Sequence, residues 1–187
     1  MTYYKVLGEN GKPHHGGMGQ WYLPTGKHPG RWMPKIANIK PCQRGYHVVN
    51  SSQLVQWLGP CIFIVEVRGE ATFQKDKSVH AQARLLRQLT TWNERTARLF
   101  AADCAEHVLP LFTKRYPNDN RPAFAIQAAR DFTENRITAN RLAAAWATAE
   151  AVSDVAGAVS DAAGAAAWNA EYEWQTQRLF HYLEVEP

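Results

Sequence analysis

Residues 61–68 read Cys-Ile-Phe-Ile-Val-Glu-Val-Arg, and this stretch decides which fold class the rest of the chain can join. It is rich in β-branched side chains, apolar on both faces at first and alternating afterwards, which is typical of a central β-strand. Gly69 follows directly and is expected to end the strand. Shorter strands are predicted at residues 2–7 and 46–49, so the N-terminal part is expected to be a small β domain.

The chain around these strands is rich in turn-forming residues. Residues 1–60 hold nine of the twelve glycines and six of the ten prolines, a density that indicates loops and irregular structure. Residues 51–58 fit a short helix that Ser51 or Ser52 caps and that Gly59-Pro60 ends.

From about residue 78 the pattern becomes helical. Residues 78–89 are predicted as a helix with Arg84 and Arg87 on its surface. Thr91-Trp-Asn-Glu94 has the form of a capping box and opens a helix to about residue 109. Pro110 is expected to kink or restart this helix, and Tyr116-Pro117 to stop it.

Two further helices are expected in the C-terminal part. Asn120 is predicted to cap one with Pro122 in its first turn, and that helix is expected to bury some of Phe124, Ile126 and Phe132. Residues 138–183 form the longest helical candidate. Its alanine-rich part, with Gly157 and Gly164 seven residues apart, favours close helix packing. The sequence thus predicts an α+β fold, with a loop-rich β domain at residues 1–75 packed against a helical array at residues 78–187.

The first sixty residues carry a strong positive charge. Seven lysines and arginines stand against one acid, Glu9, and seven aromatic rings are interspersed among them. A positive surface attracts polyanions, and flat rings give bases a surface on which to stack. We therefore expect an anionic partner, DNA above all. Lys27, Arg31, Lys35, Lys40 and Arg44 are predicted to hold phosphates, and Trp21, Trp32 or Tyr46 to stack on a flipped or unpaired base.

Two stretches resemble known families. Pro41-Cys-Gln-Arg-Gly-Tyr-His47, followed by the apolar strand and Arg68-Gly-Glu70, resembles small domains of unknown function that are common in phages and prophages. Their shared pattern is Cys, two residues, Gly, an aromatic residue and His, then a hydrophobic strand carrying an acid. Residues 104–112, with 116–122 and 125–130, are similar to a helical segment of proteins described as bacterial immunity proteins. Neither family brings an established reaction; the resemblance implies a role in conflict between phage and bacterium.

Glu66 and Glu70 flank the end of the strong strand and are the candidate catalytic acids. A carboxylate there could stabilise a cationic sugar or position a water, as in glycoside hydrolysis. The alternative is that Glu66 forms an ion pair with Arg44, Arg68 or an arginine of the predicted helix.

Arg44, Tyr46 and His47 form a second group of candidate residues. In one interpretation Arg44 clamps a phosphate and His47 shuttles a proton. In the other, Tyr46 lies in the core and His47 hydrogen-bonds to the backbone. The sequence leaves both open.

Motifs for cofactors, metals or disulfides are missing from the sequence. Neither standard phosphate-binding glycine motif occurs, and His14-His15 lacks a third ligand at suitable spacing, so no cofactor and no metal are expected. Asp103 and His107, four residues apart with Glu106 beside them, could be a metal or acid–base pair, but a surface interaction between helix positions i and i+4 is the favoured interpretation. The three cysteines show no CxxC spacing, which favours reduced thiols in a cytoplasmic protein, and no run of eighteen apolar residues indicates a membrane span.

These observations lead to three functional hypotheses. The first is a DNA-binding enzyme of phage–host conflict that cleaves an N-glycosidic bond, as a DNA glycosylase does, acting on phage DNA with or without modified bases. Glu66 or Glu70 would stabilise the sugar cation. The second is an NAD-dependent enzyme resembling ADP-ribosyltransferases. The third is a non-enzymatic immunity or inhibitor protein that binds a protein partner through its helices.

Overall fold

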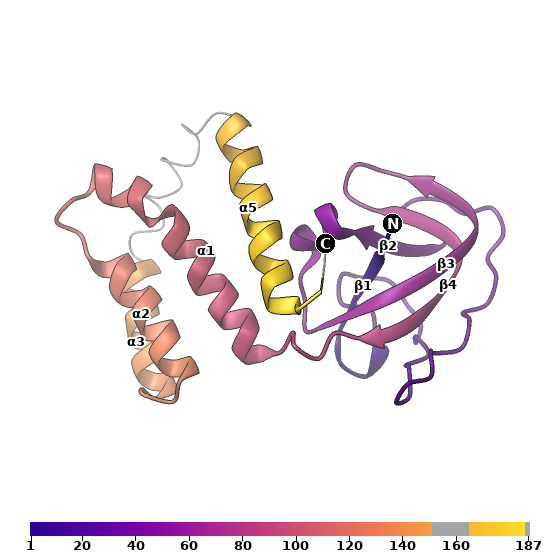
Figure 1. The fold of residues 1–187 in the computed structure, drawn as a ribbon, viewed down its shortest axis with the longest axis horizontal. Helices are drawn as coiled ribbons and strands as arrows, with labels where there is room; N and C mark the ends of the chain where they lie inside the picture. The colour runs from indigo at the N-terminus through magenta and orange to yellow at the C-terminus, as the bar shows by residue number, and fades with distance from the viewer. Residues whose placement is uncertain (151–164, 186–187) are drawn as a thin grey trace. The chain divides into compact units, whose positions relative to one another are not determined.

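A computed structural model describes residues 1–150 and 165–185 of the chain. The chain divides into two compact units. The barrel unit comprises residues 1–93 and 176–187, and the helical unit comprises residues 94–175. Strands belong to the first and helices dominate the second (Figure 1), so the α+β class expected from the sequence is confirmed.

Four antiparallel strands close into a small barrel in the order β1-β2-β4-β3. Their bounds are β1 (Tyr3–Leu7), β2 (Tyr46–Asn50), β3 (Cys61–Phe73) and β4 (Ser78–Gln88), with two short 3-10 helices, η1 (Glu9–Gly11) and η2 (Ser51–Trp57). The predicted strands at residues 2–7, 46–49 and 61–68 are therefore confirmed. The short helix predicted at 51–58 is present as η2, but Asn50 rather than Ser51 or Ser52 caps it.

Gly69 does not end the central strand as predicted. It lies inside β3 with a φ of +83°, between Arg68 and Ala71, where the pairing with β4 shifts register. A β-bulge absorbs extra residues by bending the strand, and glycine tolerates the left-handed backbone that such a bend requires. The strand therefore continues past the irregularity to Phe73.

The helix predicted at residues 78–89 is wrong, because this stretch is strand β4. Val79, Ala81, Ala83 and Leu85 are all buried, which is the two-residue period of a strand. Alanine, leucine and arginine favour helices intrinsically, but hydrogen-bonding partners on both sides override that weak preference here. These partners are β3 on one side and β2 on the other.

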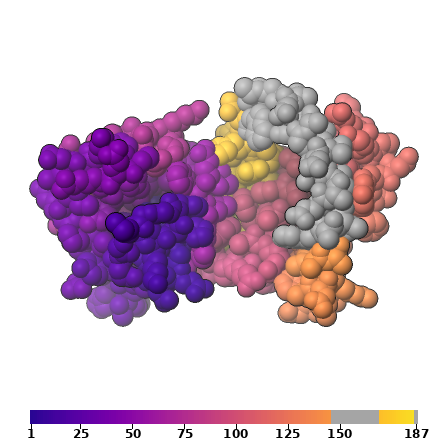
Figure 2. Space-filling model, turned by 180° about the vertical axis from the view of Figure 1, so that it is seen from behind, coloured from indigo at the N-terminus to yellow at the C-terminus, as the bar shows by residue number. Residues whose placement is uncertain are grey.

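An extended segment covers the part of β4 that β2 leaves open. Within β4, strand β2 pairs only with Ser78–His80. Beyond that point the N–H groups of Gly30, Met33 and Ile36 donate to the carbonyl oxygens of Leu85, Ala83 and Ala81 at 2.8, 2.9 and 2.9 Å. Covering a strand edge removes a site for unwanted pairing with other chains. The long loop before β2 is thus held against the barrel, and Figure 2 shows N-terminal residues (indigo) over one face of this unit.

The barrel has one apolar core drawn from all four strands. Its buried members are Leu7, Trp21, Tyr46, Val48, Phe63, Val65, Ala83 and Leu85. Trp21 comes from the loop rather than from a strand. A second packing surface joins β1 to the C-terminal end of helix α5 (Ala165–Leu183): the rings of Tyr4 and Phe180 meet edge to face at 5.6 Å. Residues 176–185 therefore belong to the barrel unit although they follow the helical unit in sequence.

The helical unit contains α1 (Glu94–Arg115), α2 (Arg121–Thr133), α3 (Ala139–Glu150) and the first part of α5. Helix α1 continues through Pro110 and ends at Arg115, directly before Tyr116-Pro117, where the sequence predicted its final stop. Asn120 precedes α2 as predicted but makes no capping bond; instead Asp119 accepts from the N–H of Arg121 at 3.1 Å. Phe124 is 69% exposed, whereas Ile126 and Phe132 are half-buried. Gly157 and Gly164 lie outside the described residues.

Arg130 on α2 joins this helix to α1 by ion pairs. Its guanidinium lies 2.7 Å from the carboxylate of buried Asp103 and 2.6 Å from that of exposed Glu106, both on α1.

Among the described helices, no segment combines the length and the apolar character that a bilayer span requires.

The ion pair with Asp103 should contribute far more to stability than the pair with Glu106. We expect Asp103→Asn to lower the free energy of unfolding by ~2 kcal/mol, because it removes the buried counter-charge of a partly buried guanidinium. Glu106→Gln, on the same arginine, should cost less than ~1 kcal/mol because the Glu106 side chain is 60% exposed. Urea unfolding of both variants measures the difference, and equal losses would contradict it.

Candidate functional site

A hollow of about 640 Å³ opens in the barrel unit and is called the barrel hollow below. Its wall combines cationic side chains (Lys5, Arg44 and Lys77) with aromatic ones (Trp21, Tyr46 and Trp57). His15, Cys42 and His47 also line it, whereas none of the described lining residues is an aspartate or a glutamate. The hollow is therefore basic and partly aromatic, within the range of volumes typical of small-molecule sites.

The motif Cys-x-x-Gly-aromatic-His forms a tight turn that the imidazole of His47 holds together. The N–H of Cys42 donates to Nε2 of His47 at 2.8 Å, and the backbone of Gly45 also hydrogen-bonds to the ring. Cys42 and Gly45 both have positive φ, at 61° and 126°. Burial, with the nearby charges of Lys5 and Lys77, lowers the pKa of His47. The imidazole is thus neutral at neutral pH, and its ring nitrogens hydrogen-bond to the backbone of the turn.

Tyr46 and Trp21 pack in the core of the barrel. The Tyr46 hydroxyl donates to the carbonyl oxygen of Pro34 at 2.7 Å, and its ring meets Trp21 edge to face at 5.5 Å. Trp21 is 6% exposed and Tyr46 is 9% exposed. Because both rings are so little exposed, a base could stack on either ring only after the core rearranged. Of the two interpretations that the sequence left open, this geometry agrees with Tyr46 in the core and His47 on the backbone.

Lys5 is the residue of this site that the sequence analysis missed. It lies on β1 between Tyr3 and Leu7, which contact the core, and its Nζ lies 5.4 Å from the centre of the Trp21 ring. Nζ donates to the carbonyl oxygen of His47 at 3.0 Å. Burial lowers the pKa of Lys5 to about 8. Among the described residues, no carboxylate lies within ion-pair distance of this ammonium. The available signal was its strand position, since alternate residues of β1 face the barrel interior.

Lys77 differs from Lys5 because its charge is balanced. Its Nζ lies 2.7 Å from the carboxylate of Asp76 and 4.8 Å from the centre of the Trp57 ring. The hydrogen bond to Asp76, with a smaller contribution from the side chain of Cys42, raises the pKa of Lys77. Trp57 in turn donates from Nε1 to the carbonyl oxygen of Asp76 at 2.9 Å.

The two candidate acids lie away from the barrel hollow. Oε2 of Glu66 accepts from Nε of Arg84 at 2.7 Å and pairs with a terminal nitrogen of the same guanidinium at 2.6 Å. This is the ion pair that the sequence offered as the alternative, although Arg84 belongs to β4 and not to a helix. Glu70 is exposed in the irregular part of β3.

The predicted phosphate-binding residues separate into two groups. All five are exposed, but Arg44 lines the barrel hollow, whereas Lys27, Arg31, Lys35 and Lys40 do not. Arg31 lies 4.3 Å from the centre of the Tyr22 ring. DNA binding through these exposed cations stays a prediction.

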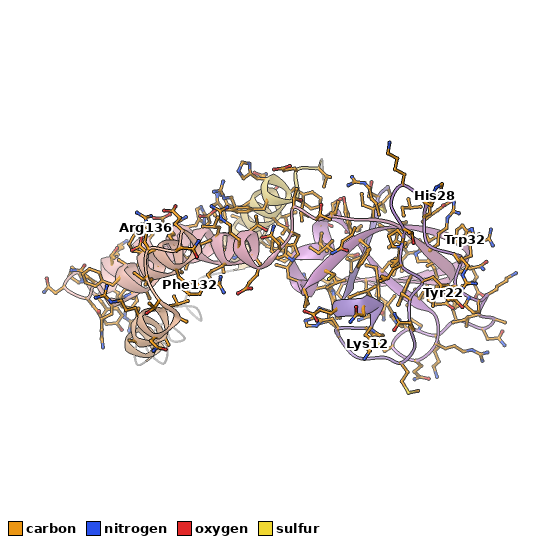
Figure 3. All side chains as sticks on the ribbon, turned by 90° about the horizontal axis from the view of Figure 1, so that it is seen from below. Lys12, Tyr22, His28, Trp32, Phe132 and Arg136 are labelled. Atoms are coloured by element: carbon orange, nitrogen blue, oxygen red, sulfur yellow. The ribbon has the colours of Figure 1, made fainter. Side chains whose placement is uncertain are left out.

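The ring of Trp32 already has cationic partners. The guanidinium of Arg68 lies 3.9 Å from its centre and that of Arg84 lies 4.8 Å from it. Figure 3 labels Trp32 and Tyr22 at the same end of the barrel unit. A base that stacked on Trp32 would compete with these two guanidinium groups, because both kinds of contact use the face of the ring.

In the helical unit, Asp103, Glu106 and His107 form ion pairs with residues of other helices. Asp103 and Glu106 both bind Arg130. His107 lies 2.7 Å from the carboxylate of Glu171, and its ring stacks on Trp174 at 3.8 Å. Within the part of the chain that the structure describes, no group of three or more His, Cys, Asp or Glu side chains could hold a metal ion.

A family model described as "Imm-5 like putative immunity protein" matches residues 87–172. The match starts at the end of β4 and covers α1, α2, α3 and part of α5. It supports the resemblance of the helical segment to immunity proteins. No curated protein and no solved structure matches the chain. The resemblance of the N-terminal motif to phage domains stays a prediction.

The motif turn gives a sharp prediction at Gly45. A Cβ placed there would lie 2.4 Å from Cγ1 of buried Val79, and the φ of 126° is unfavourable for a side chain. We expect Gly45→Ala to lower the free energy of unfolding by ~2 kcal/mol or more, through overpacking and backbone strain together.

Gly16→Ala is the matched control for this prediction. Gly16 also has a positive φ, of 81°, but nothing lies within 4 Å of a Cβ added there. Gly16→Ala should lower the free energy of unfolding only through backbone strain, by about 1 kcal/mol. Thermal unfolding of the two variants separates the effects, and a Gly45→Ala protein as stable as Gly16→Ala would show that the turn is not packed as described.

Proposed function

We propose that this chain is an immunity-type protein that protects a cell by binding a protein toxin through its helical unit. The observation that carries the proposal is the family match over residues 87–172, which spans most of that unit. The matched family is described by an immunity role and not by a reaction. Binding rather than catalysis is therefore the simplest function that the match supports.

The charged groups inside the helical unit agree with a binding role. Arg130 joins Asp103 and Glu106, and His107 joins Glu171. These contacts hold neighbouring helices together. An acid–base catalyst needs a group poised for a substrate's proton, whereas these groups are already engaged with one another.

A contact surface for the toxin is offered by the connection between α1 and α2. A wide, open hollow of about 700 Å³ lies there, and its lining includes Arg115, Tyr116, Arg121 and Phe124. The Phe124 side chain is a large apolar group that is 69% exposed. Aromatic residues and arginine dominate the energetically important centres of protein interfaces. We therefore expect Phe124 to be buried by the partner.

The charge of this connection indicates what kind of surface would bind. Lys114, Arg115 and Arg121 lie within eight residues of one another, and the nearby acid Asp119 is engaged by Arg121 at 2.7 Å. An excess of positive charge remains. Complementary potentials favour association, so the partner is expected to present an acidic surface with an apolar depression for Phe124.

The enzymatic hypotheses receive less support from the geometry. Both N-glycosidic cleavage and transfer from NAD pass through a cationic sugar that a carboxylate would stabilise. No described residue lining the barrel hollow is a carboxylate, and Glu66 is held by Arg84. Base removal and NAD-dependent transfer therefore stay predictions.

Neutralisation of a toxin tests the proposal. Toxin candidates encoded beside the gene would be expressed singly in a bacterial host, with and without the full chain, and growth would be scored. We expect the chain to restore growth against one of them. Phe124→Glu should weaken the purified complex by about thirtyfold or more, the loss typical of a hot-spot residue.

Phe73→Glu is the matched control, because Phe73 is 67% exposed but lies in the barrel unit. It should leave the affinity unchanged. Failure to neutralise any neighbouring toxin would contradict the proposed function. An equal loss from both variants would contradict the proposed surface.

A further inference from the structure

The barrel hollow holds an excess of positive charge that the protein does not balance. Lys5, Arg44 and Lys77 line it, and no described lining residue carries a negative charge. Asp76 offsets Lys77 at 2.7 Å. Lys5 and the more exposed Arg44 are thus two lining cations with no carboxylate among the described lining residues.

The ammonium of Lys5 is held in place but only partly satisfied. An ammonium has three N–H donors, and the described residues supply one acceptor, the carbonyl oxygen of His47 at 3.0 Å. The face of Trp21 provides a weaker electrostatic contact at 5.4 Å. A desolvated cation of this kind is costly unless an anion or further acceptors complete its shell. The remaining donors point to an anionic ligand.

The rest of the wall suits an organic group. Trp57, Met33, Ile36 and Val48 contribute aromatic and aliphatic surface to the same hollow. Its volume of about 640 Å³ exceeds what an inorganic ion would fill. A ligand with a doubly charged head and an apolar or ring-bearing body matches both parts of the wall.

We propose that the barrel hollow is a binding site for a phosphate monoester with an apolar or aromatic body, and that Lys5 and Arg44 hold its phosphate. A phosphate monoester carries close to two negative charges at neutral pH, which matches the unbalanced charge of the wall. The fork of the arginine side chain can take two phosphate oxygens while the lysine takes a third. This site is separate from the protein-binding surface proposed for the helical unit.

Phenyl phosphate is the probe, and isothermal titration calorimetry on the full chain is the measurement. We expect saturable binding of one phenyl phosphate per chain, with at least tenfold weaker binding of inorganic phosphate and of phenol. Lys5→Met should weaken phenyl phosphate at least tenfold, because it removes a charge-assisted partner of the phosphate. Lys75→Met replaces an exposed lysine outside the hollow and should leave binding unchanged.

The melting temperature of Lys5→Met keeps the result interpretable. Methionine fills similar space without a charge to desolvate, so the variant should melt at or above the wild-type temperature. Loss of binding in a fully folded Lys5→Met protein, with Lys75→Met intact, supports the site. No binding to the wild type, or equal binding to wild type and Lys5→Met, overturns it. If phenol binds as tightly as phenyl phosphate, the proposed contact with the phosphate is wrong. If inorganic phosphate binds as tightly as phenyl phosphate, the proposed contact with an organic body is wrong.

Discussion

The hydrogen bonds between β1 and β3 close the barrel, and most other features of the barrel unit depend on that closure. Tyr3–Leu7 pairs antiparallel with Cys61–Val65 on one side and, through Tyr3 and Tyr4, with the end of β2 on the other. Closing a sheet removes its exposed edges and turns alternate side chains of every strand inward. In β1 this places Lys5 between two residues that contact the core. A five-residue strand thus completes the fold and brings a cation into it.

The position of Lys5 has an energetic consequence that depends on pH. Its pKa in the folded protein, about 8, lies below the ordinary value of 10.5. The unfolded chain therefore holds this proton more tightly, so stability rises with pH between about 8 and 10.5 and the full penalty is present at pH 7. Proteins commonly retain such locally unfavourable groups where a ligand needs them. The positive charge of Lys5, which destabilises the folded protein by itself, is available to bind an anion.

The strands that carry an obvious local pattern could be predicted from the sequence. Residues 61–68 are rich in β-branched and apolar side chains, and they form the first part of β3. The α+β class followed from similar local evidence, and the pairing of Glu66 with an arginine was one of the two interpretations that the sequence left open. By contrast, β4 could not be predicted, because its alanines, leucines and arginines favour a helix and only its neighbours in the sheet decide otherwise. Gly69 misled for a related reason: a glycine can end a strand or occupy a bulge within it.

The candidate site was only partly predictable. Arg44, Tyr46 and His47 were singled out by their motif, and all three line the barrel hollow. Their roles depend on which side chains face inward, and that is set by pairing between distant strands. Lys5 carries no motif at all, and its significance comes from burial. The exposed lysines of the loop were predicted to bind phosphate from their charge alone, and they do not line the barrel hollow. A cluster of positive charges in the sequence does not say which cations lie together in the fold.

We propose a protein that works by binding: its helical unit resembles immunity proteins, and its barrel unit has a basic hollow. The claim on which the barrel's role depends is that the Lys5 ammonium lies inside the closed barrel and has no counter-charge there. Its ionisation can be followed directly by NMR of the lysine side chains, with Lys5→Met used for assignment. A titration midpoint near pH 8 is expected. A midpoint near the ordinary value of 10.5 would show a solvated ammonium and contradict this view of the hollow.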